Sequence, residues 1–128
     1  MKVISNAHNN NSFSLPVISF NELIKLKTDI LTISGGKDSH IFEYLKRNNV
    51  SEANKVIDQF TKHFKDDFIL EVQRTNRPDE TEYFKNVLPL AVNKGIPLVA
   101  TNDVLFANQD DYEVHETKVC INTSRTLN

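Results

Sequence analysis

Three short apolar runs, each separated from the next by a segment with helical periodicity, constrain the fold of this chain more than any other feature. The runs cover residues 29–34, 68–73 and 98–101 of 128. Strands joined through helices pair in parallel, because the crossover returns the chain to the same end of the sheet before the next strand begins. The sequence therefore predicts an α/β fold with about three parallel strands and flanking helices. Because the runs are almost entirely apolar, they also predict strands buried on both faces, as in a barrel wall.

The first half of the chain contains recognisable helix starts. Residues 1–18 form a polar lead-in segment, and residues 7–14 within it are rich in Asn and are predicted to form a loop. Ser19 and Glu22 have the spacing of a capping box, which predicts a short helix directly after the lead-in. Ser51 is predicted to cap a longer helix, in which apolar residues recur at helical spacing.

A further helix is predicted between the second and third apolar runs. Pro78 suits its first turn, and Gly95 marks its end. Pro89 lies inside the segment, and its missing N–H predicts a kink or break one turn earlier, near residues 85–86. A last helix, with a poorly formed apolar stripe, is predicted over residues 109–122.

Composition argues against several classes of protein. The net charge is −2, so the chain lacks the basic excess of a dedicated nucleic-acid-binding domain. Its one cysteine, Cys120, excludes an internal disulfide framework and suits a reducing compartment. No apolar run approaches the roughly 20 residues that a membrane-spanning helix requires. We therefore expect a soluble, cytoplasmic protein.

Polar residues and glycines follow the apolar runs at the points where ligand-binding groups of parallel α/β folds gather. The third run ends in Thr101-Asn102-Asp103, which places a carboxylate at the carboxyl end of a strand. The first run ends in Gly35-Gly36, a pair that suits a tight turn or a close approach of two backbone segments. The sequence therefore predicts that Gly36, Asp103 and Gln73, the last residue of the second run, share one edge of the sheet.

Arg74 and Arg77 are the most suggestive charges in the chain. They lie in the loop that follows the second run, and loops at strand ends carry binding groups more often than other segments do. Two interpretations remain open for them. They contact an acidic partner or a phosphate, or they pair locally with Asp79 and Glu80.

Other catalytic patterns are absent from the sequence. No serine lies in a G-x-S-x-G elbow. The segment from Gly35 to Ser39 lacks the first glycine of a phosphate-binding P-loop, and His115 lacks the second histidine of an HExxH motif. These observations exclude a serine hydrolase, a P-loop enzyme and a zincin from the leading interpretations.

Five segments together resemble one family, the PHP domains of bacterial DNA polymerase III alpha subunits. They are residues 31–36 (LTISGG), 68–74 (FILEVQR), 74–80 (RTNRPDE), 97–104 (PLVATNDV) and 110–116 (DDYEVHE). Each motif is weak alone, but five in the family's order at plausible spacing are specific. The resemblance implies that residues 1–128 are a partial PHP domain, an arc of a distorted (β/α) barrel of the TIM-like type.

The resemblance also implies that the metal site of the family is degenerate here. Hydrolytic PHP members hold a cluster of divalent metals through His, Asp, Glu and Cys ligands. Gly36 stands where those members have Cys, Leu105 replaces a His, and Asp103 matches a retained Asp. We therefore expect no catalytic residue and no bound metal, with Asp103 as a vestigial ligand held by nearby backbone amides.

By the same resemblance, the chain is part of the alpha subunit of a replicative DNA-directed DNA polymerase. The segment is expected to support the polymerase core and to dock the proofreading exonuclease subunit, with Arg74 and Arg77 as candidate contacts. Other holoenzyme subunits and DNA would be bound through the parent protein, and the parent's catalytic Mg²⁺ would lie outside this chain. The alternative is a free-standing PHP-family metal-dependent phosphoesterase.

Overall fold

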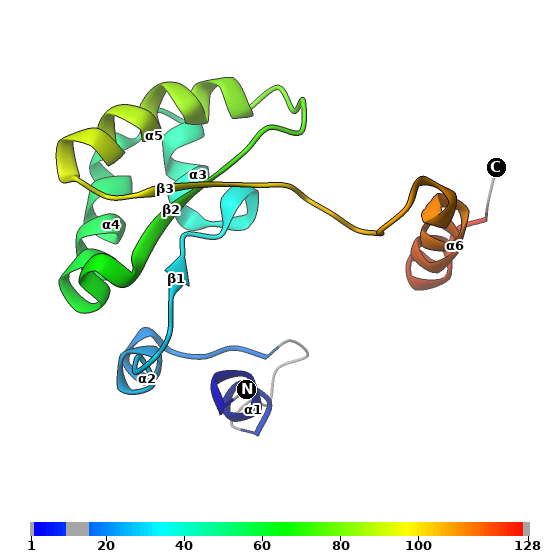
Figure 1. Cartoon of the computed structure of the whole chain (residues 1–128), viewed down its shortest axis with the longest axis horizontal. Helices are drawn as coiled ribbons and strands as arrows, with labels where there is room; N and C mark the ends of the chain where they lie inside the picture. The colour runs from blue at the N-terminus through cyan, green and yellow to red at the C-terminus, as the bar shows by residue number, and fades with distance from the viewer. Residues whose placement is uncertain (1, 10–15, 127–128) are drawn as a thin grey trace.

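A parallel three-stranded sheet forms the centre of the computed structural model, which describes residues 2–9 and 16–126 (Figure 1). The strand order is β1-β2-β3, and the strands span Thr32–Ile33, Phe68–Gln73 and Leu98–Thr101. Both pairs are parallel, with Phe68 opposite Thr32 and Gln73 opposite Thr101. The predicted parallel α/β arrangement is therefore confirmed, and it is consistent with an arc of a (β/α) barrel.

Helices connect and flank the strands throughout the described residues. None of these helices combines the length and apolarity needed to cross a membrane. The α-helices are α1 (Lys2–Asn9), α2 (Phe20–Lys25), α3 (His40–Lys46), α4 (Val50–Phe64), α5 (Glu80–Lys94) and α6 (Tyr112–Thr123). Short 3₁₀ turns are η1 (Gly36–Asp38), η2 (Lys65–Asp67) and η3 (Gln109–Asp111).

The hydrophobic core lies between β2 and the helices α3, α4 and α5, which gather on one side of the sheet in Figure 1. Phe68 and Leu70 of β2 are fully buried there. The Phe68 ring stacks on the Phe60 ring with 5.2 Å between their centroids, within the range of roughly 4.5–7 Å that is typical of aromatic pairs. The largest fully buried side chains that the helices contribute are Leu45, Ile57, Tyr83 and Val87.

The prediction that all three strands are buried on both faces is wrong. Leu31, Ile33 and Leu98 are exposed, because β1 and β3 are the edges of the sheet and the core helices pack mainly on β2. β1 is also shorter than the predicted 29–34, since only two of its residues pair in the ladder. Exposed apolar strands of this kind are typical of surfaces that other protein segments cover.

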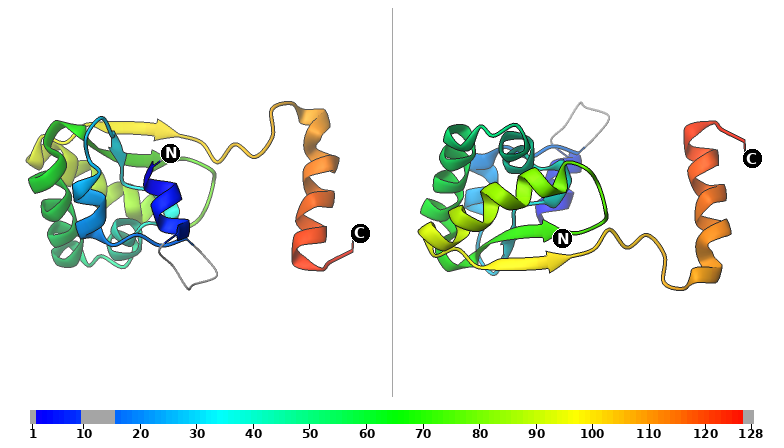
Figure 2. Two further views of the ribbon diagram at one scale, coloured as in Figure 1. Left: turned by 90° about the horizontal axis from the view of Figure 1, so that it is seen from below. Right: turned by 90° about the horizontal axis from the view of Figure 1, so that it is seen from above.

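Helix α6 lies apart from the rest of the molecule (Figures 1 and 2). The chain leaves β3, runs through residues 102–108 without regular structure and then enters η3 and α6. No residue of α6 is buried, which agrees with its poorly formed apolar stripe. The Phe106 ring packs against the rings of Tyr112 and His115, at centroid distances of 6.0 and 5.5 Å.

Two predictions about the first half of the chain need correction. Residues Ala7 to Asn9 belong to α1 and not to a loop, because Val3 and Ala7 lie one helical turn apart and Ala7 is buried. Residues 10–15 lie outside the described part. The N-cap of α4 is Asn49, whose Oδ1 accepts a hydrogen bond from the Glu52 N–H at 3.3 Å, and not Ser51.

The Ser19–Glu22 capping box is confirmed. The Glu22 N–H donates to the Ser19 hydroxyl at 3.3 Å, and the Ser19 N–H donates to the Glu22 carboxylate at 3.1 Å. These two bonds start α2 at Phe20.

Helix α5 differs from its prediction at Pro78, and the break predicted before Pro89 is absent. It begins at Glu80, so Pro78 precedes the helix and does not form its first turn. It also continues unbroken through Pro89, because burial of Val87 and Ala91 on either side favours a continuous helix over a break. The predicted stop at Gly95 is confirmed by its left-handed φ of 64°.

Glu80 anchors the loop in front of α5. Its side chain is buried, and its carboxylate accepts hydrogen bonds from the Thr75 N–H at 2.9 and 3.0 Å and from the Thr75 hydroxyl at 2.6 Å. The hydroxyl bond lowers the pKa of Glu80 below its ordinary value of 4.5, and backbone N–H groups add to the effect. The loop between β2 and α5 is therefore held by a carboxylate that must stay ionised.

This arrangement predicts a stability that falls in acid. Because the pKa of Glu80 is lower in the folded state, the unfolded chain binds more protons, so the stabilisation is complete above pH 4.5 and is lost as the pH falls through the folded pKa. Thermal unfolding at pH 6 and pH 3 should show a smaller loss of Tm for Glu80→Gln than for the unmodified chain. An equal loss in both proteins would contradict this role of Glu80.

Candidate functional site: the carboxyl edge of the sheet

The carboxyl ends of the three strands bring together side chains that lie far apart in the sequence. Gly35 and Gly36, with φ values of 86° and 42°, turn the chain sharply after β1 and place Lys37 at this edge. β2 ends in Gln73, and β3 leads into Asp103. We refer to Lys37, Glu71, Gln73, Arg77, Thr101 and Asp103 as the strand-end cluster.

Asp103 is the charged centre of the strand-end cluster. One of its carboxylate oxygens lies 2.6 Å from Lys37 Nζ and 3.6 Å from Arg77 Nη2. The hydrogen bond from Lys37 lowers the pKa of Asp103, and the charges of Lys37 and Arg77 act in the same direction. The prediction that backbone amides hold Asp103 therefore needs correction, since two side-chain cations approach its carboxylate instead.

A polar network lies beside this ion pair. The Gln73 amide donates to the Glu71 carboxylate and to the Thr101 hydroxyl, both at 3.2 Å, and the Thr101 hydroxyl donates to the same Glu71 oxygen. The Ser34 hydroxyl accepts a hydrogen bond from the Glu71 N–H at 2.9 Å. The Tyr83 hydroxyl donates to the Glu71 carbonyl at 2.7 Å, so all three strands and α5 are joined at Glu71.

Gly36 packs directly against this network. A Cβ atom at position 36 would lie 3.1 Å from the Gln73 side-chain amide carbon and oxygen. The amide is fixed by its bonds to Glu71 and Thr101, so it has little freedom to withdraw. The side chain of Gln73 therefore fills the space beside Gly36.

Arg74 and Arg77 occupy different environments. The Arg74 guanidinium lies over the Phe84 ring, 5.4 Å from its centroid, in a cation–π arrangement. The Arg77 guanidinium approaches Asp103, and its side chain is 44% exposed. Neither guanidinium forms an ion pair with Asp79 or Glu80, the local pairing that the sequence left open, because Asp79 pairs with Lys46 and Glu80 binds Thr75.

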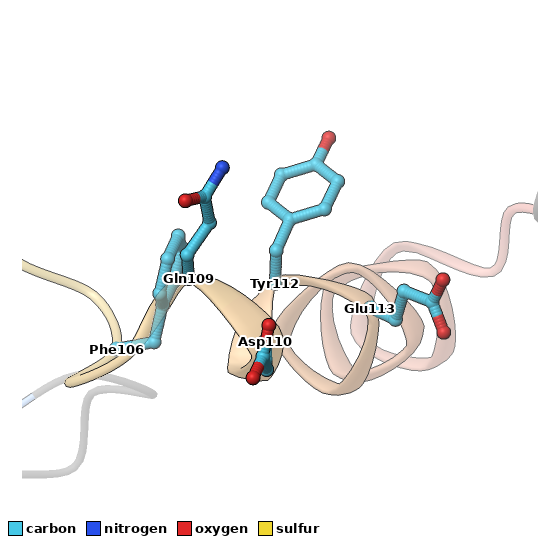
Figure 3. A pocket seen from close by; sticks show the side chains of 5 residues that line it. All are labelled: Phe106, Gln109, Asp110, Tyr112 and Glu113. Carbon is cyan, nitrogen blue, oxygen red and sulfur yellow. The ribbon is translucent and has the colours of Figure 1, made fainter.

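Leu105 does not belong to the strand-end cluster. It is exposed in the segment after β3 and borders a hollow that Val114 and His115 of α6 also line. A neighbouring hollow of about 550 Å³ lies at the start of α6 (Figure 3). Its side chains do not converge on one point, since Gln109 and Tyr112 extend to one side and Glu113 extends away from them. We therefore assign no site there.

The sequence of this chain is similar to known proteins along nearly its whole length. The family model of the PHP domain matches residues 1–75, more than half of the chain. The chain belongs to the PHP domain family. It is 36% identical over 125 residues to DNA polymerase III subunit alpha of Haemophilus influenzae, a match that includes 98% of this chain and 11% of that protein.

Other relatives of this PHP chain have the same description. DNA polymerase III subunit alpha of Escherichia coli K12 is 37% identical over 112 residues, which are 88% of this chain and 10% of that protein. The same subunit of Pseudomonas fluorescens is 41% identical over 98 residues, or 77% of this chain and 8% of that protein. This PHP chain thus spans about a tenth of the length of these relatives and is a segment of the kind that occurs in them.

The residues present do not fit the metal centre that the PHP family implies. A divalent cation needs several anionic or neutral donors around it, and the described residues contain no group of three or more His, Cys, Asp or Glu side chains placed to supply them. At the strand-end cluster, the Asp103 carboxylate already faces two cations. The carboxylate of Glu71 is bonded to Thr101 and Gln73. The described residues at this edge therefore do not supply the donor set that a divalent metal requires.

Sequence reasoning placed Gly36, Gln73 and Asp103 at one edge but missed Lys37, Glu71 and Thr101 as their partners. The signal for Lys37 was its position directly after the glycine turn of the first strand. Once the strands are known to be parallel, that turn and the end of β3 meet at one edge, so a lysine there is a natural partner for Asp103.

Proposed function

We propose that this chain works as a structural PHP segment in the alpha subunit of a replicative DNA polymerase and performs no chemistry of its own. The observation that carries this proposal is the extent of the similarity. The PHP family model ends at residue 75, whereas the match to the Haemophilus influenzae alpha subunit covers 125 of the 128 residues. The similarity therefore includes α5, β3 and α6 as well as the PHP-matching part.

The arrangement of the strand-end cluster supports a structural role. Each ionised group at this edge is engaged by a neighbour from another strand or loop: Asp103 by Lys37 and Arg77, and Glu71 by Thr101 and Gln73. A general base or a nucleophile needs a free lone pair directed at a substrate. An edge whose acidic groups are ion-paired or hydrogen-bonded to its own side chains is suited to stability rather than catalysis.

A free-standing metal-dependent phosphoesterase is the alternative function, and one assay separates it from the proposal. The purified chain is incubated with a chromogenic phosphomonoester and with Mn²⁺ or Zn²⁺. We expect no turnover above that of an Asp103→Asn variant. Metal-dependent turnover that Asp103→Asn abolishes would support the phosphoesterase and contradict the structural role.

The parent's activity and partners belong to the same proposal. DNA-directed nucleotidyl transfer, its Mg²⁺ and the contact with DNA would lie in other parts of a cytoplasmic alpha subunit, since this chain spans about a tenth of its relatives. Within that subunit, the PHP segment would dock the proofreading exonuclease and contact other holoenzyme subunits. The exposed loop that carries Arg74 and Arg77 is our candidate contact surface for the exonuclease.

The docking proposal predicts a defined loss of affinity. Arg74→Glu and Arg77→Glu, introduced together in an alpha subunit that carries this segment, should weaken exonuclease binding by about 1–3 kcal/mol, because a charged contact is lost and repulsion is added. A titration of labelled exonuclease subunit measures the change. Primer extension should stay near normal, since nucleotidyl transfer occurs elsewhere in the parent.

A charge-matched control distinguishes this contact from a general effect of charge. Arg47→Glu and Lys55→Glu make the same change in net charge at side chains that are 74% and 69% exposed, one at the C-cap of α3 and the other on α4. The control pair should bind the exonuclease normally. Equal affinity of both double variants would remove the Arg74 loop from the interface.

A further inference from the structure

We propose that Lys37 is a built-in cation that clasps the turn after β1 to the end of β3 and keeps divalent metals away from Asp103. Metal binding at this edge is then prevented by side chains that are present, as well as by the loss of metal ligands at positions 36 and 105. The contact involves only this chain's own residues and does not depend on the polymerase assignment.

The contact has the geometry of a direct charge-assisted hydrogen bond. Lys37 Nζ and Asp103 Oδ2 are 2.6 Å apart, although the residues are 66 positions apart in the sequence. Both side chains are partly shielded, with 28% and 34% of their surfaces exposed. Arg77 approaches the same oxygen at 3.6 Å from the loop after β2. One carboxylate thus joins the carboxyl-end loops of all three strands.

Two positive charges at this carboxylate oppose the approach of a third. A divalent cation at Asp103 would have to displace the Lys37 ammonium or lie beside it and beside the Arg77 guanidinium. Like charges within a few ångströms repel strongly where solvent screens them only in part. Lys37 therefore supplies the positive charge that a metal ion would supply to Asp103, and it does so without further ligand residues.

The Gln73 side chain fills the space beside Gly36. Its amide lies where a side chain at position 36 would have to be, 3.1 Å from the place of a Cβ atom. Glu71 and Thr101 hold the amide in that position through hydrogen bonds at 3.2 Å. A thiolate restored at position 36 would thus meet Gln73 on one side and Lys37 next to it in the chain.

The clasp is expected to act locally, since partly exposed ion pairs contribute little to global stability. Removing one partner should therefore change the amide exchange of the other partner's loop, although no backbone hydrogen bonds of the sheet join the two loops directly. The Lys55–Glu52 pair provides a matched control: its N–O distance is also 2.6 Å, but both residues lie on one turn of α4. Removing Lys55 should leave the strand-end loops unchanged.

Amide hydrogen exchange of the 128-residue chain tests the clasp. Lys37→Met should accelerate exchange of residues 101–104, and Asp103→Asn should accelerate exchange of residues 35–38, each by about two- to fivefold, which corresponds to the loss of a partly exposed ion pair. Lys55→Met should change neither loop. If each variant affects only its own loop, or neither, the clasp does not exist.

Zinc binding tests the exclusion of metal. Gly36→Cys and Gln73→Ala are combined to place a thiol ligand at the strand-end cluster and make room for it, and this variant is compared with one that also carries Lys37→Met. We expect at least about tenfold tighter Zn²⁺ binding without Lys37, measured by competition with a chromophoric chelator. Equal affinity in the two variants, including no binding by either, would show that Lys37 does not exclude the metal.

Discussion

Phe68→Ala is expected to destabilise the protein by about 3–5 kcal/mol, the typical cost of deleting a fully buried aromatic side chain. Phe68 begins the central strand, has no exposed surface and stacks on Phe60 at 5.2 Å. A domain of this size has a total stability of roughly 5–15 kcal/mol, so this one change removes a large part of it. Urea unfolding followed by circular dichroism measures the loss as a lower transition midpoint.

Val92→Ala is the matched control for this prediction. Val92 lies on α5 with 79% of its surface exposed, so its truncation should change stability by no more than about 0.5 kcal/mol. Equal midpoints for Phe68→Ala and the unmodified chain would contradict the assignment of β2 to the core.

Gly36→Val is the second large effect, with an expected cost of about 2–4 kcal/mol. The φ of 42° strains any β-branched residue, and the added side chain would press on the fixed amide of Gln73, 3.1 Å from the Cβ position. Urea unfolding again measures the cost. Gln73→Ala in the same chain should return part of the loss, because it removes the steric contact and leaves only the backbone strain.

Gly95 separates these two causes. Its φ of 64° imposes a similar backbone strain, but no atom beyond the adjacent residues of the chain lies within 4 Å of its Cβ position. Gly95→Val should therefore cost only about 1–2 kcal/mol. Equal costs at positions 36 and 95, or no relief from Gln73→Ala, would show that Gln73 does not fill the space beside Gly36.

The number of strands and their parallel direction were predictable because they depend on patterns that the sequence displays directly. Three apolar runs separated by helical segments permit few arrangements, and the parallel pairing followed from the crossovers. The ends of the helices were harder to predict. Asn49 and Ser51 both have side chains that can cap a helix, and only the packing of α4 decides between them. The continuous path of α5 through Pro89 likewise depends on tertiary burial of its neighbours.

The position of the site was predictable, but its contacts were not. Carboxyl ends of parallel strands share an edge, which placed Gly36 and Asp103 together from the sequence alone. The partner of Asp103 depends on the direction that Gly35 and Gly36 give to Lys37, and two positive φ values set that direction. The sequence offered Asp79 and Glu80 as partners for Arg77, because they lie close to it along the chain. In the folded loop, Arg77 approaches Asp103 instead, and Asp79 pairs with Lys46.

A segment exchange tests the central claim, that this chain is a structural PHP segment of a polymerase alpha subunit, most directly. The matching 125-residue stretch of the Haemophilus influenzae alpha subunit is replaced by this chain, and primer extension is measured. We predict extension within a few-fold of the unmodified subunit, and its loss when the inserted segment carries Phe68→Ala. A soluble chimera of normal size that does not extend primers, or one that the Phe68→Ala change leaves unaffected, would contradict the claim.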